Sequence, residues 1–143
     1  MSLRFKRLME EYEAFQMNAL QLAYIGDAVW DMIIRQDAVF QKFNIHHMHL
    51  YCVNRVNAGA QAEKLSMIRD QLTEREEEIV RRGRNSHAKH PSPKNQDPQD
   101  YSASTGFEAL LGYLYLSGQD ERIEQLVNIL RKQEGENGNT EKT

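Results

Sequence analysis

Residues 18–40 form the longest stretch of this sequence in which apolar side chains recur at helical spacing on almost every face. The apolar positions in it include Leu20, Leu22, Ile25, Val29, Ile33 and Ile34. A helix that is apolar on nearly all sides is usually buried inside a bundle of other helices. Helical spacing also dominates the rest of the chain, and we find no convincing run of alternating strand residues. The sequence therefore predicts an all-α helical bundle.

Four more helical segments are expected after this one. The first covers about residues 44–71, the second 73–83, the third about 102–118 and the last about 120–132. The motif "TERE" at residues 73–76 matches a capping box, in which the threonine hydroxyl and the glutamate side chain bind backbone N–H groups at a helix start. Gly83 is the expected end of that helix, because glycine favours the conformation that stops helices.

The chain is expected to form one domain, over residues 1–133. Residues 84–100 hold all three prolines and are predicted to form a mobile basic loop, while the polar tail 134–143 is predicted to be disordered. No run reaches the roughly 18 apolar residues of a membrane span. The single cysteine, Cys52, is interpreted as a small buried apolar residue and not as a catalytic thiol, and a lone cysteine suits a reducing compartment. We therefore expect a cytoplasmic protein.

Positive charge is concentrated in one part of an otherwise acidic chain. The net charge is −3, and residues 81–94 contain five basic residues and no acidic one, which leaves −8 for the remainder. This segment, "RRGRNSHAKHPSPK", has two open interpretations: a helix end followed by a solvated loop, or an arm that binds phosphates. Arginine side chains suit phosphate oxygens because their N–H groups form a planar fork.

Asp27 and Glu108 are the two acidic residues that stand out, because each lies in a strongly apolar helical segment. Either one alone could be an ordinary, partly exposed position. Gly26, directly before Asp27, has no side-chain bulk and would let another backbone or a ligand approach. If the two carboxylates converge, they make an oxygen-rich site of the kind that Mg²⁺ prefers. By contrast, His46 and His49 lack the partners of a closed zinc site and are expected to lie on the surface.

Four motifs, in this order, resemble the ribonuclease III superfamily, and more closely its Mini-ribonuclease III group, which has the catalytic domain alone. They are "LAYIGDAVWD" at residues 22–31, "VNAGAQA" at 56–62, "RRGRN" at 81–85 and "STGFEALLGYLYL" at 104–116. The resemblance implies an all-α endonuclease domain that forms a homodimer and carries no double-stranded-RNA-binding domain. It also implies hydrolysis of double-stranded RNA to products with 5′-phosphates and short 3′ overhangs.

The resemblance assigns roles to particular residues. Asp27 and Glu108 match catalytic, metal-binding carboxylates for Mg²⁺, for which Mn²⁺ can substitute. Two other carboxylates of the wider superfamily are replaced here by Ala23 and Thr105. Asp31 is a secondary candidate for a ligand or water contact, as is Ser104. The expected RNA-binding residues are Arg81, Arg82, Arg84, Asn85, Lys89 and Lys94.

The same resemblance points to a substrate and to one alternative. Mini-ribonuclease III proteins are associated with maturation of 23S ribosomal RNA, so precursor 23S RNA is the expected partner, with assistance from a ribosomal protein as an open possibility. The alternative is a catalytically inactive RNA-binding module, as found elsewhere in the superfamily. The reduced carboxylate set favours this alternative, and the retention of Asp27 and Glu108 opposes it.

Overall fold

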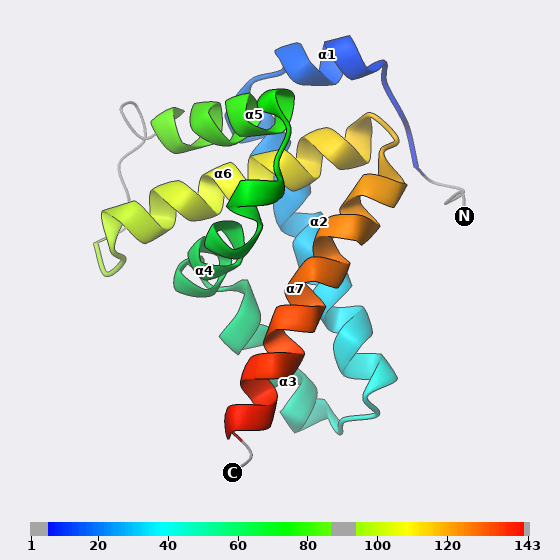
Figure 1. Ribbon diagram of the computed structural model, residues 1–143, viewed down its shortest axis with the longest axis vertical. Helices are drawn as coiled ribbons and strands as arrows, with labels where there is room; N and C mark the ends of the chain where they lie inside the picture. The colour runs from blue at the N-terminus through cyan, green and yellow to red at the C-terminus, as the bar shows by residue number, and fades with distance from the viewer. Residues whose placement is uncertain (1–5, 87–93, 142–143) are drawn as a thin grey trace.

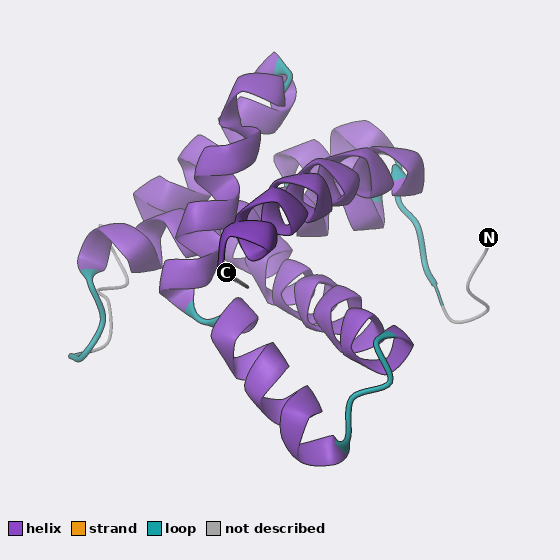
Figure 2. Cartoon of the chain, turned by 60° about the horizontal axis from the view of Figure 1, so that its bottom comes forward, coloured by secondary structure: helices purple, strands orange, loops and turns teal. Residues whose placement is uncertain are grey.

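The structure, a computed structural model, describes residues 6–86 and 94–141, and all regular secondary structure in these ranges is helical (Figures 1 and 2). The elements are α1 (Glu11–Gln16), α2 (Ala19–Phe40), α3 (Ile45–Val56), α4 (Ala58–Ile68), the short 3₁₀ helix η1 (Arg69–Gln71), α5 (Glu74–Asn85), α6 (Pro98–Leu116) and α7 (Asp120–Glu141). The predicted all-α fold is confirmed. Within the described ranges, no helix combines the length and the apolar character needed to cross a membrane.

Helix α6 lies at the centre of the bundle. It packs against α2, α4, α5 and α7, and Figure 1 shows α5 alongside it and α2 crossing behind it. From Ala103 to Leu114 every residue of α6 is buried except Glu108, which is half-buried. The aromatic rings of Trp30 on α2 and Phe107 on α6 pack edge to face, with centroids 5.0 Å apart. A helix buried on so many sides explains why its apolar residues face all directions.

Two glycines bring the backbones of α2 and α6 into direct contact. A Cβ atom built on Gly26 would lie 1.6 Å from the carbonyl oxygen of Glu108. A Cβ atom built on Gly112 would lie 1.9 Å from the carbonyl oxygen of Leu22. No side chain fits at either point, so the crossing requires glycine on both helices. This contact places Asp27, the residue after Gly26, beside Glu108.

Helix α5 begins at the predicted capping box. The backbone N–H of Glu76 donates to Thr73 Oγ1 at 3.2 Å, and the backbone N–H of Thr73 donates to Glu76 Oε1 at 2.9 Å. The predicted end at Gly83 is wrong, because the helix continues to Asn85. Gly83 instead serves packing: a Cβ atom there would lie 2.7 Å from the Cα atom of Gly106 on α6.

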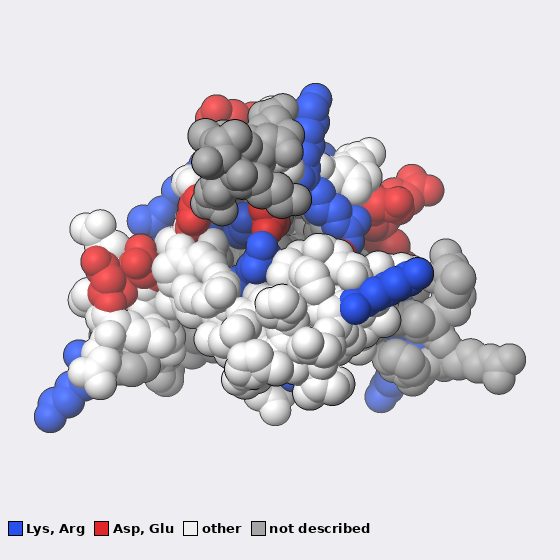
Figure 3. Space-filling model, turned by 90° about the horizontal axis from the view of Figure 1, so that it is seen from below, with Lys and Arg blue, Asp and Glu red and all other residues white. Residues whose placement is uncertain are grey.

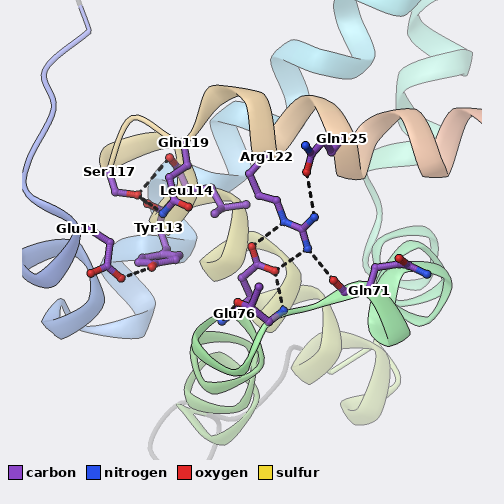
Figure 4. Close-up of polar contacts among 10 residues, drawn as sticks. Glu11, Gln71, Glu76, Tyr113, Leu114, Ser117, Gln119, Arg122 and Gln125 are labelled. Atoms are coloured by element: carbon purple, nitrogen blue, oxygen red, sulfur yellow. Dashed lines mark hydrogen bonds and ion pairs between the residues drawn. The ribbon is translucent and has the colours of Figure 1, made fainter.

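Glu76 also ties α5 to α7, as Figure 4 shows. Arg122 donates from Nε to Glu76 Oε2 and from Nη2 to Glu76 Oε1, each at 2.9 Å, and Nη2 also donates to the carbonyl oxygen of Gln71 at 2.6 Å. Burial by itself would raise the pKa of Glu76, but hydrogen bonds from Arg122 and Thr73 outweigh it and hold that pKa below its usual value. The buried carboxylate is therefore fully paired, as buried charges need to be.

The segment predicted as one helical stretch over residues 44–71 is divided at Asn57. This residue has extended backbone angles, φ −73° and ψ 163°, and it lies between α3 and α4. Its Oδ1 accepts the backbone N–H of Ala60 at 2.8 Å, and its Nδ2 donates to the carbonyl oxygen of Val53 at 3.0 Å. One side chain therefore caps both helices, which is how asparagine competes with helix continuation.

Helix α6 starts earlier than predicted, at Pro98. Asp97 caps it, accepting the backbone N–H of Gln99 at 2.7 Å, and proline is well suited to a first helical position. Because α5 runs to Asn85 and α6 begins at Pro98, both ends of the predicted loop 84–100 are helical. The predicted mobility of residues 87–93 lies outside the described residues.

Helix α7 continues to Glu141, well beyond the predicted end near Lys132. The tail that was predicted to be disordered from residue 134 is therefore helical through Glu141, and residues 142–143 lie outside the described ranges. Glu134 explains part of this extension, because it pairs with Arg55 on α3 at 2.6 Å and with Lys64 on α4 at 3.7 Å. Composition alone does not reveal these partners.

We predict that Gly26→Ala destabilises the protein by about 3 kcal/mol or more, because the added methyl group forces α2 and α6 apart. Urea unfolding measures the change. Gly135→Ala is the matched control, since a Cβ atom at Gly135 on α7 meets no atom within 4 Å. There the better helix propensity of alanine should stabilise the protein by up to about 1 kcal/mol. Equal stability of Gly26→Ala and the wild type would contradict the proposed crossing.

Candidate metal and catalytic site

The structure brings Asp27 and Glu108 together. Asp27 is an exposed residue of α2, whereas Glu108 is the half-buried residue of the buried α6 segment. Their carboxyl groups lie within hydrogen-bonding reach of each other. The glycine contact between the two helices creates this proximity, since Gly26 touches the backbone of Glu108 itself. Two residues 81 positions apart in the sequence therefore form one acidic pair.

Burial and the neighbouring Asp27 carboxylate together raise the pKa of Glu108 to about 8. Burial is the larger cause, because it penalises the charged form. The hydrogen bond and the negative charge of Asp27 act in the same direction. Without a cation, Glu108 therefore keeps its proton near neutral pH and shares it with Asp27. Such perturbed carboxyl groups are typical of functional sites.

A cation would change this balance. A divalent ion between the two carboxyl groups favours the ionised form of both and removes their mutual repulsion. Within residues 6–86 and 94–141, no three His, Cys, Asp or Glu side chains form a group that could hold a metal ion. Two carboxylates alone suit Mg²⁺, which keeps several waters and uses one or two protein carboxylates together with phosphate oxygens. The donor set at this site therefore fits that ion.

Gln61 on α4 is a third polar residue at this site, and it was not singled out from the sequence. Its side chain is 2% exposed, and it acts on the Glu108 carboxyl group in the direction that lowers the Glu108 pKa. Its Nε2 atom approaches that carboxyl group but reaches no acceptor among the described residues with the geometry of a full hydrogen bond. A signal was present in the sequence, because Gln61 precedes Leu65 and Ile68 by one and two helical turns and so lies on the core face of α4.

The two residues that replace superfamily carboxylates are held by contacts within the protein. Ala23 is buried in the core, and the Thr105 hydroxyl donates to the carbonyl oxygen of Tyr101 at 3.0 Å. The two secondary candidates are also engaged. Asp31 accepts a hydrogen bond from Arg35 Nε at 2.9 Å, and the Ser104 hydroxyl donates to the same Tyr101 carbonyl at 2.8 Å. The structure therefore groups neither Asp31 nor Ser104 with the Asp27–Glu108 pair.

Two of the predicted RNA-binding arginines are engaged in contacts within the protein. Arg81 binds Glu78 through Nε at 2.9 Å, and Arg82 binds Glu78 at 3.3 Å and donates to the carbonyl oxygen of Phe15. The hydrogen bond from Arg81, helped by that from Arg82, lowers the pKa of Glu78 to about 2. Their positive charge is thus partly offset before any RNA binds.

The other predicted RNA-binding residues differ in position. Arg84 is half-buried near the end of α5, and its carbonyl oxygen accepts the Ser102 hydroxyl at 2.9 Å. The structure shows no ion pair of Arg84 with a described residue. Asn85 and Lys94 are exposed, while Lys89 lies outside the described residues. Arg84, Asn85 and Lys94 therefore have the polar groups available for a ligand.

The histidines and the cysteine show no sign of a separate site. His46 and His49 on α3 are exposed, and Cys52 is half-buried as a free thiol. This agrees with the interpretation of the histidines as surface residues, whereas Cys52 is less buried than expected.

Comparison with known proteins gives the family. Residues 20–119 match the ribonuclease III domain family. Mini-ribonuclease 3 of Symbiobacterium thermophilum is 44% identical over 109 residues, which is 76% of this chain and 83% of that protein. Mini-ribonuclease 3 of Enterococcus faecalis is 41% identical over 133 residues, covering 90% and 97%.

A solved structure agrees with these relatives. The crystal structure of a protein from Fusobacterium nucleatum matches with a TM-score of 0.77 and 28% sequence identity, covering 88% of this chain and 99% of that one. The family match includes both carboxylates of the acidic pair. The chain therefore belongs to the ribonuclease III family, within it to the Mini-ribonuclease III group, and is an endoribonuclease.

Proposed function

We propose that this endoribonuclease cleaves double-stranded RNA with the help of Mg²⁺ held by Asp27 and Glu108. The observation that carries the proposal is the convergence of these two carboxyl groups at the crossing of α2 and α6. Asp27 is exposed, so the pair is accessible from solvent. An acidic pair of this kind would repel an RNA phosphate by itself, and a bound cation turns the same place into a site that attracts it.

The chain's own residues have distinct tasks in this proposal. Asp27 and Glu108 bind the ion or its waters, and neither needs to transfer a proton. Glu108 would bind the ion as an ionised carboxylate. When bound, Mg²⁺ would act as a Lewis acid that stabilises charge on the phosphodiester and activates water, and Mn²⁺ can replace Mg²⁺. We leave Asp31 and Ser104 out of the ligand set, because Arg35 and the Tyr101 carbonyl already hold them.

The basic segment is the proposed contact with the RNA backbone. Recognition of duplex RNA depends mostly on phosphate and 2′-hydroxyl contacts rather than on base edges. We assign the main contacts to Arg84, Asn85 and Lys94, with Lys89 as part of the same segment. Arg81 and Arg82 contribute less to RNA binding than the sequence indicated, because both form ion pairs with Glu78.

A homodimer is part of the proposal, and an uncharged surface supports it. Figure 3 shows the end of the molecule at which α2 and α3 meet, with a broad region free of acidic side chains and with few basic ones. Large apolar side chains are exposed along the length of α2 and at the start of α3: Tyr24 by 83%, Met32 by 54%, Phe40 by 82% and Ile45 by 80%. Exposed apolar patches of this kind mark interaction surfaces.

The shape of this surface suits a second copy of the chain. A mainly apolar groove between α2 and α7 is lined by Ile25, Val29, Met32, Ile33 and Ile123, and the Lys6–Asp120 ion pair also lines it. The exposed Tyr24 directly precedes Ile25, one of the residues that line this groove. A knob next to a groove allows two copies to fit each other about a twofold axis. Such a dimer would hold two acidic pairs, one for each RNA strand.

For the biological substrate we propose precursor 23S ribosomal RNA, matured in the cytoplasm with a ribosomal protein as a possible assistant. The similarity to Mini-ribonuclease 3 proteins supports this choice. The second candidate is an inactive RNA-binding module, which the positions Ala23 and Thr105 favour because they lack carboxylates. End mapping of the products from precursor 23S RNA separates specific maturation from general cutting and from binding alone.

We predict that Asp27→Asn and Glu108→Gln each lower the rate of duplex RNA cleavage in Mg²⁺ at least about 100-fold. Loss of a residue that only orients a metal ligand costs about 10- to 100-fold, and loss of the ligand itself should cost more. Single-turnover cleavage of a labelled duplex measures the rate. Asp31→Asn is the matched control, because it removes the same charge one turn further along α2, where Arg35 is the partner. Its rate should stay close to the wild-type rate. Full activity of Asp27→Asn would contradict the proposed centre.

The raised pKa of Glu108 predicts a pH dependence of stability in metal-free protein. The folded protein holds a proton at Glu108 up to about pH 8, whereas the unfolded chain releases it around 4.5. The stabilisation from this proton is therefore complete below 4.5 and is lost as the pH rises towards about 8. Thermal unfolding of the wild type and of Glu108→Gln, both with chelator, should show a Tm difference that falls over this window and then levels off. A difference independent of pH would contradict the pKa assignment.

We predict that the wild type sediments as a dimer and that Tyr24→Arg raises the dissociation constant at least about thirtyfold, the effect of losing one interface hot spot. Analytical ultracentrifugation over a range of concentrations measures it. Tyr12→Arg is the control, because Tyr12 is also an exposed tyrosine, 58% accessible, but belongs to α1 and not to the proposed surface on α2 and α3. A wild-type monomer at high concentration would rule out the proposed surface.

A further inference from the structure

One buried donor in this protein has no partner. Gln61 is 2% exposed, and its Nε2 atom is the single buried side-chain nitrogen or oxygen without a hydrogen bond in the described part of the chain. A buried donor that bonds nothing destabilises the folded protein, because it loses its hydrogen bonds to water and gains none in return. The other buried polar side chains, such as Glu76 and Lys64, have partners. An isolated exception of this kind calls for a reason.

The position of Gln61 supplies that reason. Gln61 lies on the core face of α4, and its side chain points to the carboxyl group of Glu108 on α6. An ionised carboxylate accepts hydrogen bonds in about four directions, so one oxygen can face a cation while another accepts an amide N–H.

We propose that Gln61 is a positioning residue of the metal site, which donates from Nε2 to the Glu108 carboxylate when a divalent cation is bound and so holds the ligating oxygen in place. This inference rests on the metal site proposed above. Ligands are commonly oriented by such outer hydrogen bonds, and their loss weakens metal binding about 10- to 100-fold. In a site with only two carboxylates, a fixed orientation of one of them matters more than in a fuller set.

A purely structural role for Gln61 makes the opposite prediction. If the side chain only fills space in the core, a similar-sized apolar residue should leave metal binding unchanged. If it has an unseen structural bond, that replacement should lower the stability of the metal-free protein. Our proposal expects neither result, because in the metal-free protein Nε2 bonds no described residue and its removal relieves an unsatisfied donor.

The test is Mn²⁺ binding to RNA-free protein, followed by isothermal titration calorimetry, together with thermal unfolding in chelator. Gln61→Leu and Gln61→Met both remove the amide at nearly constant volume. Each should raise the Mn²⁺ dissociation constant about tenfold or more, while the metal-free Tm stays equal or rises. Lys64→Met is the matched control on the same helix, because Lys64 is also buried but pairs with Glu134 instead of contacting Glu108. Its Mn²⁺ affinity should equal that of the wild type.

The outcomes separate the two proposals. Wild-type Mn²⁺ affinity in Gln61→Leu and Gln61→Met would overturn the role of Gln61 while leaving the metal site intact. Loss of folding in both variants would also overturn it, since a donor that bonds nothing should be dispensable without metal. If the wild type and Asp27→Asn bind Mn²⁺ equally, the metal site itself is wrong and the role of Gln61 falls with it.

Discussion

The crossing of α2 and α6 is the contact on which the rest of the structure depends. At Gly26 and Gly112 the two backbones touch with no side chain between them. Any side chain there would separate the helices by at least the width of a methyl group. The same contact puts the carboxyl group of Asp27 beside that of Glu108, so packing and chemistry share one point. Two carboxylates this close repel each other when both are ionised, so the pair needs a shared proton or a bound cation.

The surroundings of the pair show how the protein manages this charge. The raised pKa of Glu108 keeps one negative charge out of the metal-free site. Gln61 brings a donor to the same carboxyl group from a third helix, α4. Elsewhere in the protein, partly buried carboxylates are matched by arginines, as Glu76 is by Arg122. No arginine serves Asp27 or Glu108 in the described part of the chain, and this difference supports the cation site proposed there.

Most of the fold could be predicted from periodicity and capping, because these are local properties. The bounds of α2 and the capping box of α5 are correct, and Gly26 was expected to permit close approach. The helix breaks missed at Asn57 and Asp97 come from local caps. Other errors involve partners distant in sequence. Gly83 was predicted to end a helix, but it packs on Gly106. Helix α7 was predicted to end before Glu134, but Glu134 forms an ion pair with Arg55 on α3.

The two carboxylates of the candidate site could be predicted from the sequence, but Gln61 beside them could not. Asp27 and Glu108 stand out because charge in an apolar segment is visible in a sequence. Gln61 does not, since a neutral amide leaves no such contrast and its missing partner appears only in three dimensions. In the same way, the basic residues could be counted from the sequence. The pairing of Arg81 and Arg82 with Glu78 depends on where their side chains lie along α5.

The central claim is that Asp27 and Glu108 together bind a divalent cation. Anomalous diffraction from crystals of the protein soaked in Mn²⁺ tests it most directly, because the metal scatters anomalously and is located without assumptions about ligands. Our account predicts an anomalous peak between the two carboxyl groups at the crossing of α2 and α6, absent in crystals of Asp27→Asn. A well-occupied Mn²⁺ site elsewhere, with none at this pair, would contradict it.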